Sequence, residues 1–397
     1  MSPAAPLRIG VAGLGRAFTL MLPTFSADPR IRLVAAADPL AQARARFESD
    51  FGGRSHDSVE ALCADPEVQA VYVATPHQFH AEHVLLAAAH GKHVLVEKPM
   101  AITLEQCSAM IAATTAAGVH MVVGHSHSFN APIARTRALI DSGRFGAVRM
   151  LTALNFTDFL YRPRRAEELD TQAGGGVIHS QATHQIDILR LLGGGRVRSV
   201  SAHTGAWDPL RPTEGAYQAL LAFDGGVLAS ATYSGYAHYD SDELLGNIGE
   251  LGQHKQPQDY GAARKRLRET AAEMPESRLK AARNYGGALY AMPAASPAEH
   301  QHFGHIVVSC DHADLRPTAT GIEIFADAAK SFEPLPRPAI ARAEVIDELV
   351  GAVLHGRDPL HNGAWARATT EVCLAILASS ASGQARTMHY QLGLDRE

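Results

Sequence analysis

The sequence lacks any apolar run near the roughly 20 residues that a membrane-spanning helix needs, so we expect no membrane partner. It has only four cysteines in 397 residues, far apart and without a C-x-x-C pair, which argues against a disulfide scaffold. Its first ten residues lack the basic start and apolar core of a signal peptide. These absences together predict a cytoplasmic protein.

The sequence also has no excess of basic residues over acidic ones. The 36 Lys and Arg residues face 41 Asp and Glu residues, a net charge of −5, which argues against nucleic acid as a partner. The basic run at Arg264–Arg268 is then expected to be the solvated face of a helix. With 46% hydrophobic residues, the chain can form two or three folded domains with sizeable cores.

The first third of the chain alternates short apolar runs with helical spacing, the pattern of a parallel sheet covered by helices. The predicted strands are Leu7–Ala12, Ile31–Ala37, Ala70–Ala74, His93–Val96 and His120–Val123. The predicted helices between them are Pro39–Phe51, His80–Ala89 and Leu104–Ala117. We therefore expect an α/β fold whose residues 1–124 form a Rossmann domain, a doubly wound parallel sheet.

The pattern changes after Gly124, where strands follow one another with few helices between them. The predicted strands are Arg149–Phe156, Val197–His203, Tyr217–Phe223 and Val227–Tyr233, and the predicted helices are Ile178–Leu192, Glu344–His355 and Ala364–Ser380. Asp224-Gly225-Gly226 indicates a hairpin turn. We expect residues 125–397 to form an α+β domain with an open, mostly antiparallel sheet, a polar insertion at about 241–297, a linker at Glu333–Pro338 and closing helices within 344–380.

A glycine pattern follows the first strand, in Gly10-Val-Ala-Gly13-Leu-Gly15-Arg16-Ala17-Phe18. Gly13 permits the tight turn and Gly15 lets the backbone approach a pyrophosphate at the helix N-terminus, while Phe18 replaces the usual third glycine. An ordinary strand-to-helix turn is the alternative. The expected cofactor-binding residues of this stretch and of the next strand's end are Gly13, Gly15, Arg16, Ala17, Phe18 and Asp38.

The acid at the end of the second predicted strand bears on which dinucleotide binds. Asp38 lies about 20 residues after the glycines, where a carboxylate accepts the hydroxyls of the adenosine ribose. A carboxylate there disfavours a 2′-phosphate, and the first basic residue that follows is Arg44. The sequence therefore favours NAD over NADP.

A lysine stands at the end of another predicted strand, in Glu97-Lys98-Pro99. Ligands of open α/β sheets bind beyond the carboxyl ends of the strands, so Lys98 is expected to face the nicotinamide. A partly buried lysine there can orient a hydroxyl or relay its proton. The alternative is a surface lysine paired with Glu97.

Three further motifs are present: Ala74-Thr75-Pro76 with His80, Gly91 to Pro99, and Gly174-Gly175-Gly176 with His184 and Asp187. Together they resemble the inositol dehydrogenase and glucose–fructose oxidoreductase (Gfo/Idh/MocA) family. The resemblance implies hydride transfer between NAD(P) and a carbinol carbon, with an open sheet that mediates a homo-oligomer. It makes Lys98 and His184 catalytic, and it adds Thr75, Pro76, His80 and Glu97 to the cofactor site.

Two positions depart from that family's pattern. Ser180 stands where the family commonly has Asp, four residues before the histidine, and Ser128-Phe129 stands in place of Arg-Phe. We therefore expect Lys98 and His184 to work with Ser180 or Gln181 instead of an Asp–His pair. His184 suits a proton acceptor because the ordinary histidine pKa of about 6.5 leaves it mostly neutral at pH 7. A structural histidine on a core helix is the alternative.

Further stretches resemble one branch of the family, the phthalate 4,5-cis-dihydrodiol dehydrogenases. They are Asp158 to Arg165, Ser180-Gln181 and Thr204-Gly205-Ala206-Trp207. The branch implies oxidation of a ring cis-diol, whose ketone product tautomerises to a stable catechol. An anionic substrate would suit the guanidinium groups of Arg162, Arg164 and Arg165. A solvated loop or a subunit contact is the alternative for these arginines.

Histidines are numerous, 21 in all, which raises the possibility of a metal site. His77, His80 and His83 are spaced by three, but no carboxylate or cysteine partner is evident and hydride transfer in this fold needs no metal. We expect no metal, and place His125 and His127 in the substrate pocket. The rival functions are a sugar or inositol dehydrogenase of the same family and a non-catalytic NAD-binding regulator, which would be expected to have lost Lys98 or His184.

Overall fold

The computed structural model describes residues 5–271, 274–291 and 297–394, and these divide into two compact units. Unit 1 comprises Met1–His125, Ser277–Ser296 and Ile340–Arg367. Unit 2 comprises Ser126–Glu276, Pro297–Ala339 and Ala368–Glu397. Two late segments thus belong with the N-terminal unit, whereas the sequence pattern places everything after residue 124 in the second domain.

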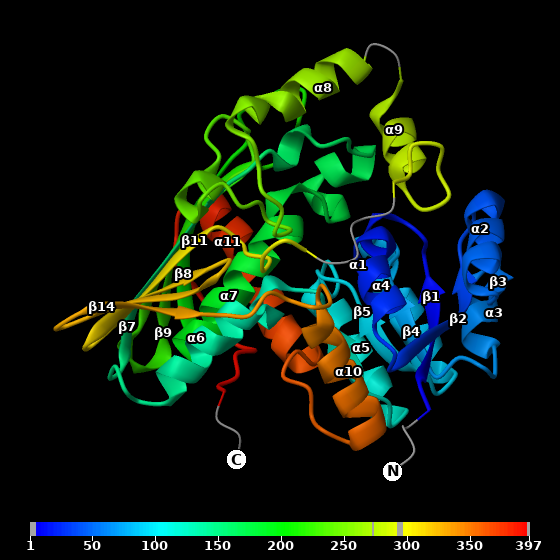
Figure 1. The fold of residues 1–397 in the computed structure, drawn as a ribbon, viewed down its shortest axis with the longest axis horizontal. Coiled ribbons are helices and arrows are strands. Elements are labelled where there is room, and N and C mark those ends of the chain that lie inside the picture. The colour runs from blue at the N-terminus through cyan, green and yellow to red at the C-terminus, as the bar shows by residue number, and fades with distance from the viewer. Residues whose placement is uncertain (1–4, 272–273, 292–296, 395–397) are drawn as a thin grey trace. The chain divides into compact units, whose positions relative to one another are not determined.

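Unit 1 is a six-stranded parallel sheet with helices, in the strand order β3-β2-β1-β4-β5-β6 (Figure 1). Its strands are β1 (Leu7–Ala12), β2 (Ile31–Ala37), β3 (Arg54–His56), β4 (Ala70–Val73), β5 (His93–Val96) and β6 (Met121–Val123). Its helices are α1 (Arg16–Ala27), α2 (Ala41–Phe51), α3 (Val59–Ala64), α4 (His80–Ala89), α5 (Leu104–Ala116), α9 (Glu276–Arg283) and α10 (Ala343–His355). This order is that of the Rossmann fold, and the prediction is confirmed.

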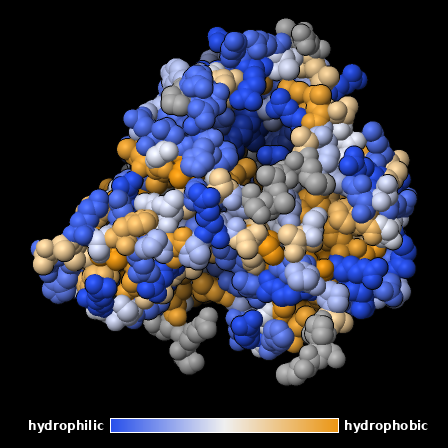
Figure 2. Space-filling model, viewed as in Figure 1, coloured by the Kyte–Doolittle hydropathy of each residue, from blue (hydrophilic) through white to orange (hydrophobic). Residues whose placement is uncertain are grey.

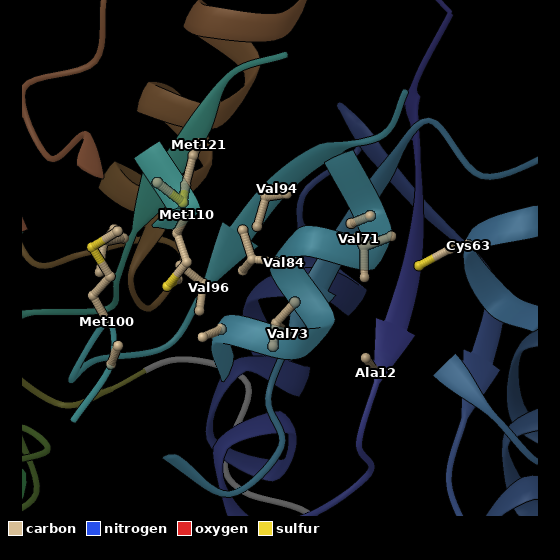
Figure 3. Close-up of a cluster of buried hydrophobic side chains, with 14 of the residues drawn as sticks. Ala12, Cys63, Val71, Val73, Val84, Val94, Val96, Met100, Met110 and Met121 are labelled. Carbon is tan, nitrogen blue, oxygen red and sulfur yellow. The ribbon is translucent and has the colours of Figure 1, made fainter. Parts of the chain in front are cut away.

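The core of unit 1 explains why its strands are apolar at nearly every position. Val71, Val73, Val94 and Val96 come from β4 and β5 and pack with Val84 of α4 (Figure 3). All five are fully buried. A strand covered on both faces has no solvent-facing side, so its sequence does not alternate between apolar and polar residues.

Local capping and turn chemistry set the helix ends that the sequence predicts. Thr103 precedes α5, and its hydroxyl accepts a hydrogen bond from the Gln106 amide at 3.2 Å. The short β3 is not predicted by the sequence pattern, because its three residues carry no apolar signal.

Unit 2 contains a nine-stranded sheet in the order β14-β13-β12-β11-β7-β10-β9-β8-β15. The strands are β7 (Val148–Phe156), β8 (Val197–Gly205), β9 (Ala216–Phe223), β10 (Leu228–Ser234), β11 (His305–Cys310), β12 (Ala313–Thr318), β13 (Gly321–Ala326), β14 (Lys330–Pro334) and β15 (Arg386–Thr387). Only β7 and β10 pair in parallel; the other pairs are antiparallel, as predicted.

Helices cover one face of this sheet. They include α6 (Ala131–Asp141), which packs on β12 and β13, and α7 (Thr183–Gly193), which packs on β7 and β10 (Figure 1). The remaining helices are α8 (Ala262–Ala271), where the basic run lies, and α11 (Gly363–Ser382). Asp224–Gly226 turns β9 into β10 with positive φ angles at both glycines, which confirms the hairpin.

One predicted boundary in unit 2 is wrong. The expected linker at Glu333–Pro338 begins inside β14, where Pro334 is tolerated because β14 is an edge strand. The helix expected at Ile178–Leu192 is present, and its first turn, Ile178–Ala182, is π-helical before α7. Among the helices that the structure describes, none is long and apolar enough to cross a membrane. The four cysteines form no disulfide with one another.

Candidate active site

The glycine turn of unit 1 has the shape that a dinucleotide needs. Gly13 has a φ of +92°, and a β-carbon there would lie 3.0 Å from the carbonyl oxygen of Ala74. Only glycine fits such an approach. Gly15 is the N-cap of α1, with Arg16 and Ala17 in the helix's first turn. The space over Gly15 is open, since its nearest neighbour is an amide nitrogen 3.9 Å from a built β-carbon.

Asp38, directly after β2, accepts hydrogen bonds from the glycine turn and from the backbone that follows Asp38 itself. Its Oδ2 accepts from the Leu14 amide and its Oδ1 from the Leu40 amide, both at 2.8 Å. The Arg44 guanidinium donates to the Asp38 carbonyl oxygen at 2.8 Å. A carboxylate and a guanidinium therefore lie together at the end of β2, although the sequence separates them by six residues.

The segment after β4 is braced by a buried histidine. One ring nitrogen of His80 lies 2.9 Å from the Thr75 carbonyl oxygen and the other 2.9 Å from that of Pro99. A neutral imidazole can donate to only one of them, and burial lowers the pKa of His80. This histidine thus connects the Thr75 segment to the segment that carries Lys98. It fixes both segments at the edge of the sheet where the cofactor is expected.

Lys98 follows β5 next to a buried carboxyl group. Glu97 is 8% exposed and accepts a hydrogen bond from the Tyr72 hydroxyl at 2.6 Å. Burial raises the pKa of Glu97, against the opposing effects of the Tyr72 hydrogen bond and the nearby Lys98 charge. Lys98 itself is partly exposed. Its position gives it access to a ligand while Glu97 anchors its backbone.

These side chains share one edge of the unit 1 sheet. Gly13 and Gly15 follow β1, Asp38 follows β2, Thr75 follows β4 and Lys98 follows β5. The carboxyl ends of parallel strands meet at the same edge, where ligands of open α/β sheets bind. The open space at Gly15 and the acid after β2 fit a dinucleotide with a diphosphate and an adenosine ribose.

Unit 2 brings two buried histidines into ring contact. His184, on α7, and His127 have ring centroids 4.6 Å apart in an edge-to-face arrangement. Phe303 packs against both, at 4.9 Å from His184 and 5.2 Å from His127. Both histidines are at most 5% exposed. The predicted catalytic histidine and one predicted pocket histidine are therefore neighbours.

His127 is in turn held by polar groups that the sequence did not single out. Its Nδ1 lies 2.9 Å from Asn130 Nδ2, and its Nε2 lies 3.4 Å from Glu250 Oε1. Glu250 lies on no predicted motif, and no spacing in the sequence relates it to His127. The Glu250 carboxylate contacts His127, which in turn contacts His184. A carboxylate is therefore present near His184 even though Ser180 replaces the family's acid.

Ser128 and Asp187 belong to a buried structural network. The Ser128 hydroxyl donates to Asp187 Oδ2, and the Thr369 hydroxyl donates to Asp187 Oδ1 at 2.8 Å. Arg190 donates to Thr369, also at 2.8 Å. The serine that replaces the family's arginine thus fixes the segment of His127 to α7.

The residues expected to assist His184 lie in the π-helical turn. Gln181 is buried; it accepts from the Tyr233 hydroxyl at 3.2 Å and donates to the Ser180 carbonyl at 3.1 Å. Ser180 is partly exposed. Gln181 is therefore already bonded to its neighbours, which is the arrangement of a residue that holds the turn in place.

Two of the three predicted substrate arginines have a carboxylate oxygen within 3 Å. Arg162 Nε donates to Asp158 at 2.8 Å, and Arg162 Nη2 lies 3.4 Å from Glu250. Burial opposes its charge, but these carboxylates prevail and raise the pKa of Arg162. Arg165 Nε lies 2.9 Å from Glu167. Most of the charge of both arginines is thus compensated within the protein.

Arg164 is different, because its guanidinium is nine-tenths buried and has no carboxylate at hydrogen-bond distance among the described residues. It lies 3.7 Å from the Phe159 ring centroid and donates to the Phe159 carbonyl at 2.5 Å. The nearest carboxylate, Glu168, is 3.9 Å away. Burial lowers the pKa of Arg164 to about 10. A buried cation with so little compensation favours an anionic ligand.

The predicted site residues divide between the two units. The cofactor residues, Lys98 and the buried His125 lie in unit 1, whereas His127, Ser180, Gln181, His184 and the three arginines lie in unit 2. Within the described part of the chain, no group of three or more His, Cys, Asp and Glu side chains could hold a metal ion.

Comparisons with known proteins agree with this geometry. Residues 7–125 match the oxidoreductase family with an NAD-binding Rossmann fold, and residues 133–253 match the GFO/IDH/MocA C-terminal domain. The chain is 51% identical, over 94% of each chain, to 1-carboxy-3-chloro-3,4-dihydroxycyclohexa-1,5-diene dehydrogenase of Comamonas testosteroni. It is 31% identical, over 62% of this chain and 73% of the relative, to inositol 2-dehydrogenase 2 of Saccharopolyspora erythraea.

A solved structure is also close. A protein described as a dehydrogenase from Bordetella bronchiseptica RB50 is 41% identical and superimposes with a TM-score of 0.90, covering 96% of this chain and 100% of that one. Fold and site together define a dehydrogenase that depends on a nicotinamide dinucleotide. The chain belongs to the Gfo/Idh/MocA family of oxidoreductases.

Proposed function

We propose that this enzyme oxidises a cis-dihydrodiol of an aromatic carboxylate with NAD and yields a catechol. The observation that carries the proposal is the 51% identity, over nearly the whole chain, to a dehydrogenase whose name describes a carboxylated dihydroxycyclohexadiene. The buried Arg164 guanidinium supports it, because a substrate carboxylate would be a closer anionic partner than Glu168, which lies 3.9 Å away. The best candidate is a substrate of the phthalate 4,5-cis-dihydrodiol type.

The residues of the chain have two tasks: to accept the proton of the substrate hydroxyl and to orient the substrate. When bound, the nicotinamide supplies the hydride acceptor. As the carbinol becomes a carbonyl, its hydroxyl proton must leave. We assign proton acceptance to His184 and orientation of the hydroxyl to Lys98. His127 contacts both His184 and Glu250. We assign to this pair the stabilisation of the positive charge that His184 gains with the proton. The ketone then tautomerises to the catechol, which makes the oxidation favourable.

Production of NADH tests this function directly. The purified protein, NAD and phthalate 4,5-cis-dihydrodiol should give equal amounts of NADH, measured at 340 nm, and catechol, measured by chromatography. Inositol and sugars form the second arm, because a relative is an inositol dehydrogenase. Turnover of polyols alone would assign the protein to the rival substrate class. Binding of NADH without turnover of either class would favour a regulator. We expect the cytoplasm to be the compartment of the reaction.

The cofactor preference gives a sharper prediction, centred on Asp38. We expect Asp38→Ser to lower kcat/KM for NAD by about 10- to 100-fold, since a charge-assisted hydrogen bond contributes about 1.5–3 kcal/mol. The same change should raise the NADP to NAD ratio, because Arg44 lies at the same strand end. Initial rates with both cofactors measure this, with the exposed Asp327→Ser as the control. A wild-type protein that prefers NADP would contradict the assignment.

We further propose that a second copy of the chain covers the open face of the nine-stranded sheet. Leu228 and Met150 are paired across β10 and β7 and are 57% and 50% exposed, and Leu220 on β9 is 65% exposed. Apolar surface is visible near the labelled β7 and β14 (Figures 1 and 2). Exposed apolar surface of this kind marks an interaction site.

Leu228→Glu should therefore dissociate the oligomer. The carboxylate would have to lose its hydration on association, which costs several kcal/mol without a partner. Light scattering coupled to gel filtration should show the wild type at two or more times the mass of one chain and the variant at a lower multiple. Leu210→Glu, at an exposed leucine outside the sheet, is the matched control. A wild type at the mass of one chain refutes the proposal.

A further inference from the structure

A late segment of the chain, residues 277–291, packs within unit 1. It carries most of α9 and the turn that follows. It lies outside both ranges that match the family, residues 7–125 and 133–253. The sequence pattern showed only a polar insertion here. The segment therefore adds residues to the dinucleotide-binding unit that neither matched range contains.

Tyr285 anchors this segment to the first two helices of the unit. The ring is 2% exposed and packs edge-to-face on Phe18 of α1 at 5.2 Å. Its hydroxyl donates to Asp50 of α2 at 2.7 Å. A β-carbon on Gly286 would lie 3.0 Å from the Cα of Ala43, so the backbone touches α2 as well. Phe18, the residue that replaces the third glycine of the motif, thus serves as the platform for Tyr285.

Asn284, the residue before this anchor, faces the glycine turn. Its Nδ2 lies 3.9 Å from the position of a β-carbon built on Gly15, and among the described residues it is the one neighbour within 4 Å outside the adjoining backbone. Gly15 is the N-cap of α1. The unpaired amides and the dipole of a helix N-terminus attract a pyrophosphate to that space. An amide donor therefore borders the place where the phosphates would lie.

Hydrogen bonds fix the backbone of Asn284 at the end of α9. The Asn284 amide donates to the Ala281 carbonyl at 3.1 Å, and the Gly287 amide donates to the Asn284 carbonyl at 2.9 Å. With Tyr285 buried directly after it, the backbone at Asn284 is fixed beside the glycine turn. Little backbone entropy would then be lost when the side-chain amide meets a ligand.

We propose that Asn284 is a dinucleotide-binding residue whose side-chain amide donates to the pyrophosphate, and that residues 277–291 form one wall of the cofactor site. The ligand class is a nucleotide diphosphate, which every nicotinamide dinucleotide contains. The proposal rests on the proposed function only in its cofactor, not in its substrate. Asn284 has no net charge, so it adds a hydrogen-bond donor beside the helix N-terminus without a non-specific attraction for anions.

The dissociation constant of NADH, measured by its fluorescence on the full-length protein, tests this proposal without any substrate. Asn284→Ala should weaken binding by about 10- to 100-fold, as expected for a hydrogen bond to a charged group. Asn284→Asp, which has nearly the same shape, should weaken it further because a carboxylate repels phosphate. Gln384→Ala, at an exposed amide in unit 2, is the control and should bind as the wild type does.

The possible outcomes separate this proposal from the proposed function. Unchanged binding in both Asn284 variants, with an unchanged melting temperature, would show that the segment only packs. Tighter binding in Asn284→Ala would show that the asparagine obstructs the site. Either result overturns the inference. A wild type that binds NADH normally but leaves dihydrodiols unoxidised overturns only the substrate assignment, whereas a wild type that binds no dinucleotide overturns both.

Discussion

Replacement of Lys98 by methionine is expected to lower kcat for diol oxidation by about 10²- to 10³-fold, the usual contribution of a positioned donor at the reacting oxygen. Methionine has an unbranched side chain one atom shorter than that of lysine, and it removes the charge and the three donors. The buried Glu97 and its bond from Tyr72 remain, so the backbone after β5 should stay in place. We therefore expect the dissociation constant of NADH to stay close to the wild-type value.

The comparison needs a lysine that is remote from the chemistry. Lys265, on α8, is 72% exposed, and Lys265→Met should have wild-type rates. Lys98→Arg keeps the charge but spreads it over a planar group, and it should recover only part of the activity. If Lys98→Met turns over at the wild-type rate with intact NADH binding, the assignment of Lys98 is wrong and this strand end serves only to bind the cofactor.

Replacement of His184 by alanine should be at least as damaging, by about 10²- to 10⁴-fold in kcat, the usual contribution of a proton-transfer group. The reason is chemical, because the imidazole is the group assigned to accept the hydroxyl proton. His312→Ala, at a histidine with a 64% exposed side chain, is the matched control. Unit 1 contains the glycine turn, so NADH binding should not change.

A purely structural role for His184 would give a different result. The ring packs against His127 and Phe303, so its loss leaves a cavity that lowers stability. His184→Gln fills most of that space and has no basic nitrogen. If His184→Gln restores both the melting temperature and kcat, then His184 supports the fold and another group accepts the proton. If it restores only the melting temperature, the catalytic assignment stands.

The cofactor edge was predictable because its residues are adjacent to strands with a strong local signal. Gly13, Asp38, Thr75 and Lys98 each follow a short apolar run, and the parallel topology places all such ends at one edge. Short-range sequence was sufficient there. The prediction that His80 belongs to this site came from the family resemblance. The structure adds that both ring nitrogens of His80 contact carbonyl oxygens.

The surroundings of His184 could not be predicted in this way. Phe303 and Glu250 come from segments more than 60 residues away in sequence, and neither lies in a motif. Their contacts are set by long-range packing, which leaves no periodic signal. The same holds for Tyr285, which belongs to unit 1 although more than 200 residues separate it from Phe18. The arginine cluster was predicted as a group, but only burial distinguishes Arg164 from its two neighbours.

The central claim is that the substrate is a carboxylated cis-dihydrodiol, and one comparison of kcat/KM tests it. With NAD in excess, phthalate 4,5-cis-dihydrodiol should exceed the same ring diol without carboxylates by about 10- to 100-fold, the contribution of a charge-assisted hydrogen bond to Arg164. It should exceed myo-inositol by more. Arg164→Gln should remove most of the carboxylate preference. A higher kcat/KM for myo-inositol than for the carboxylated diol would contradict the account.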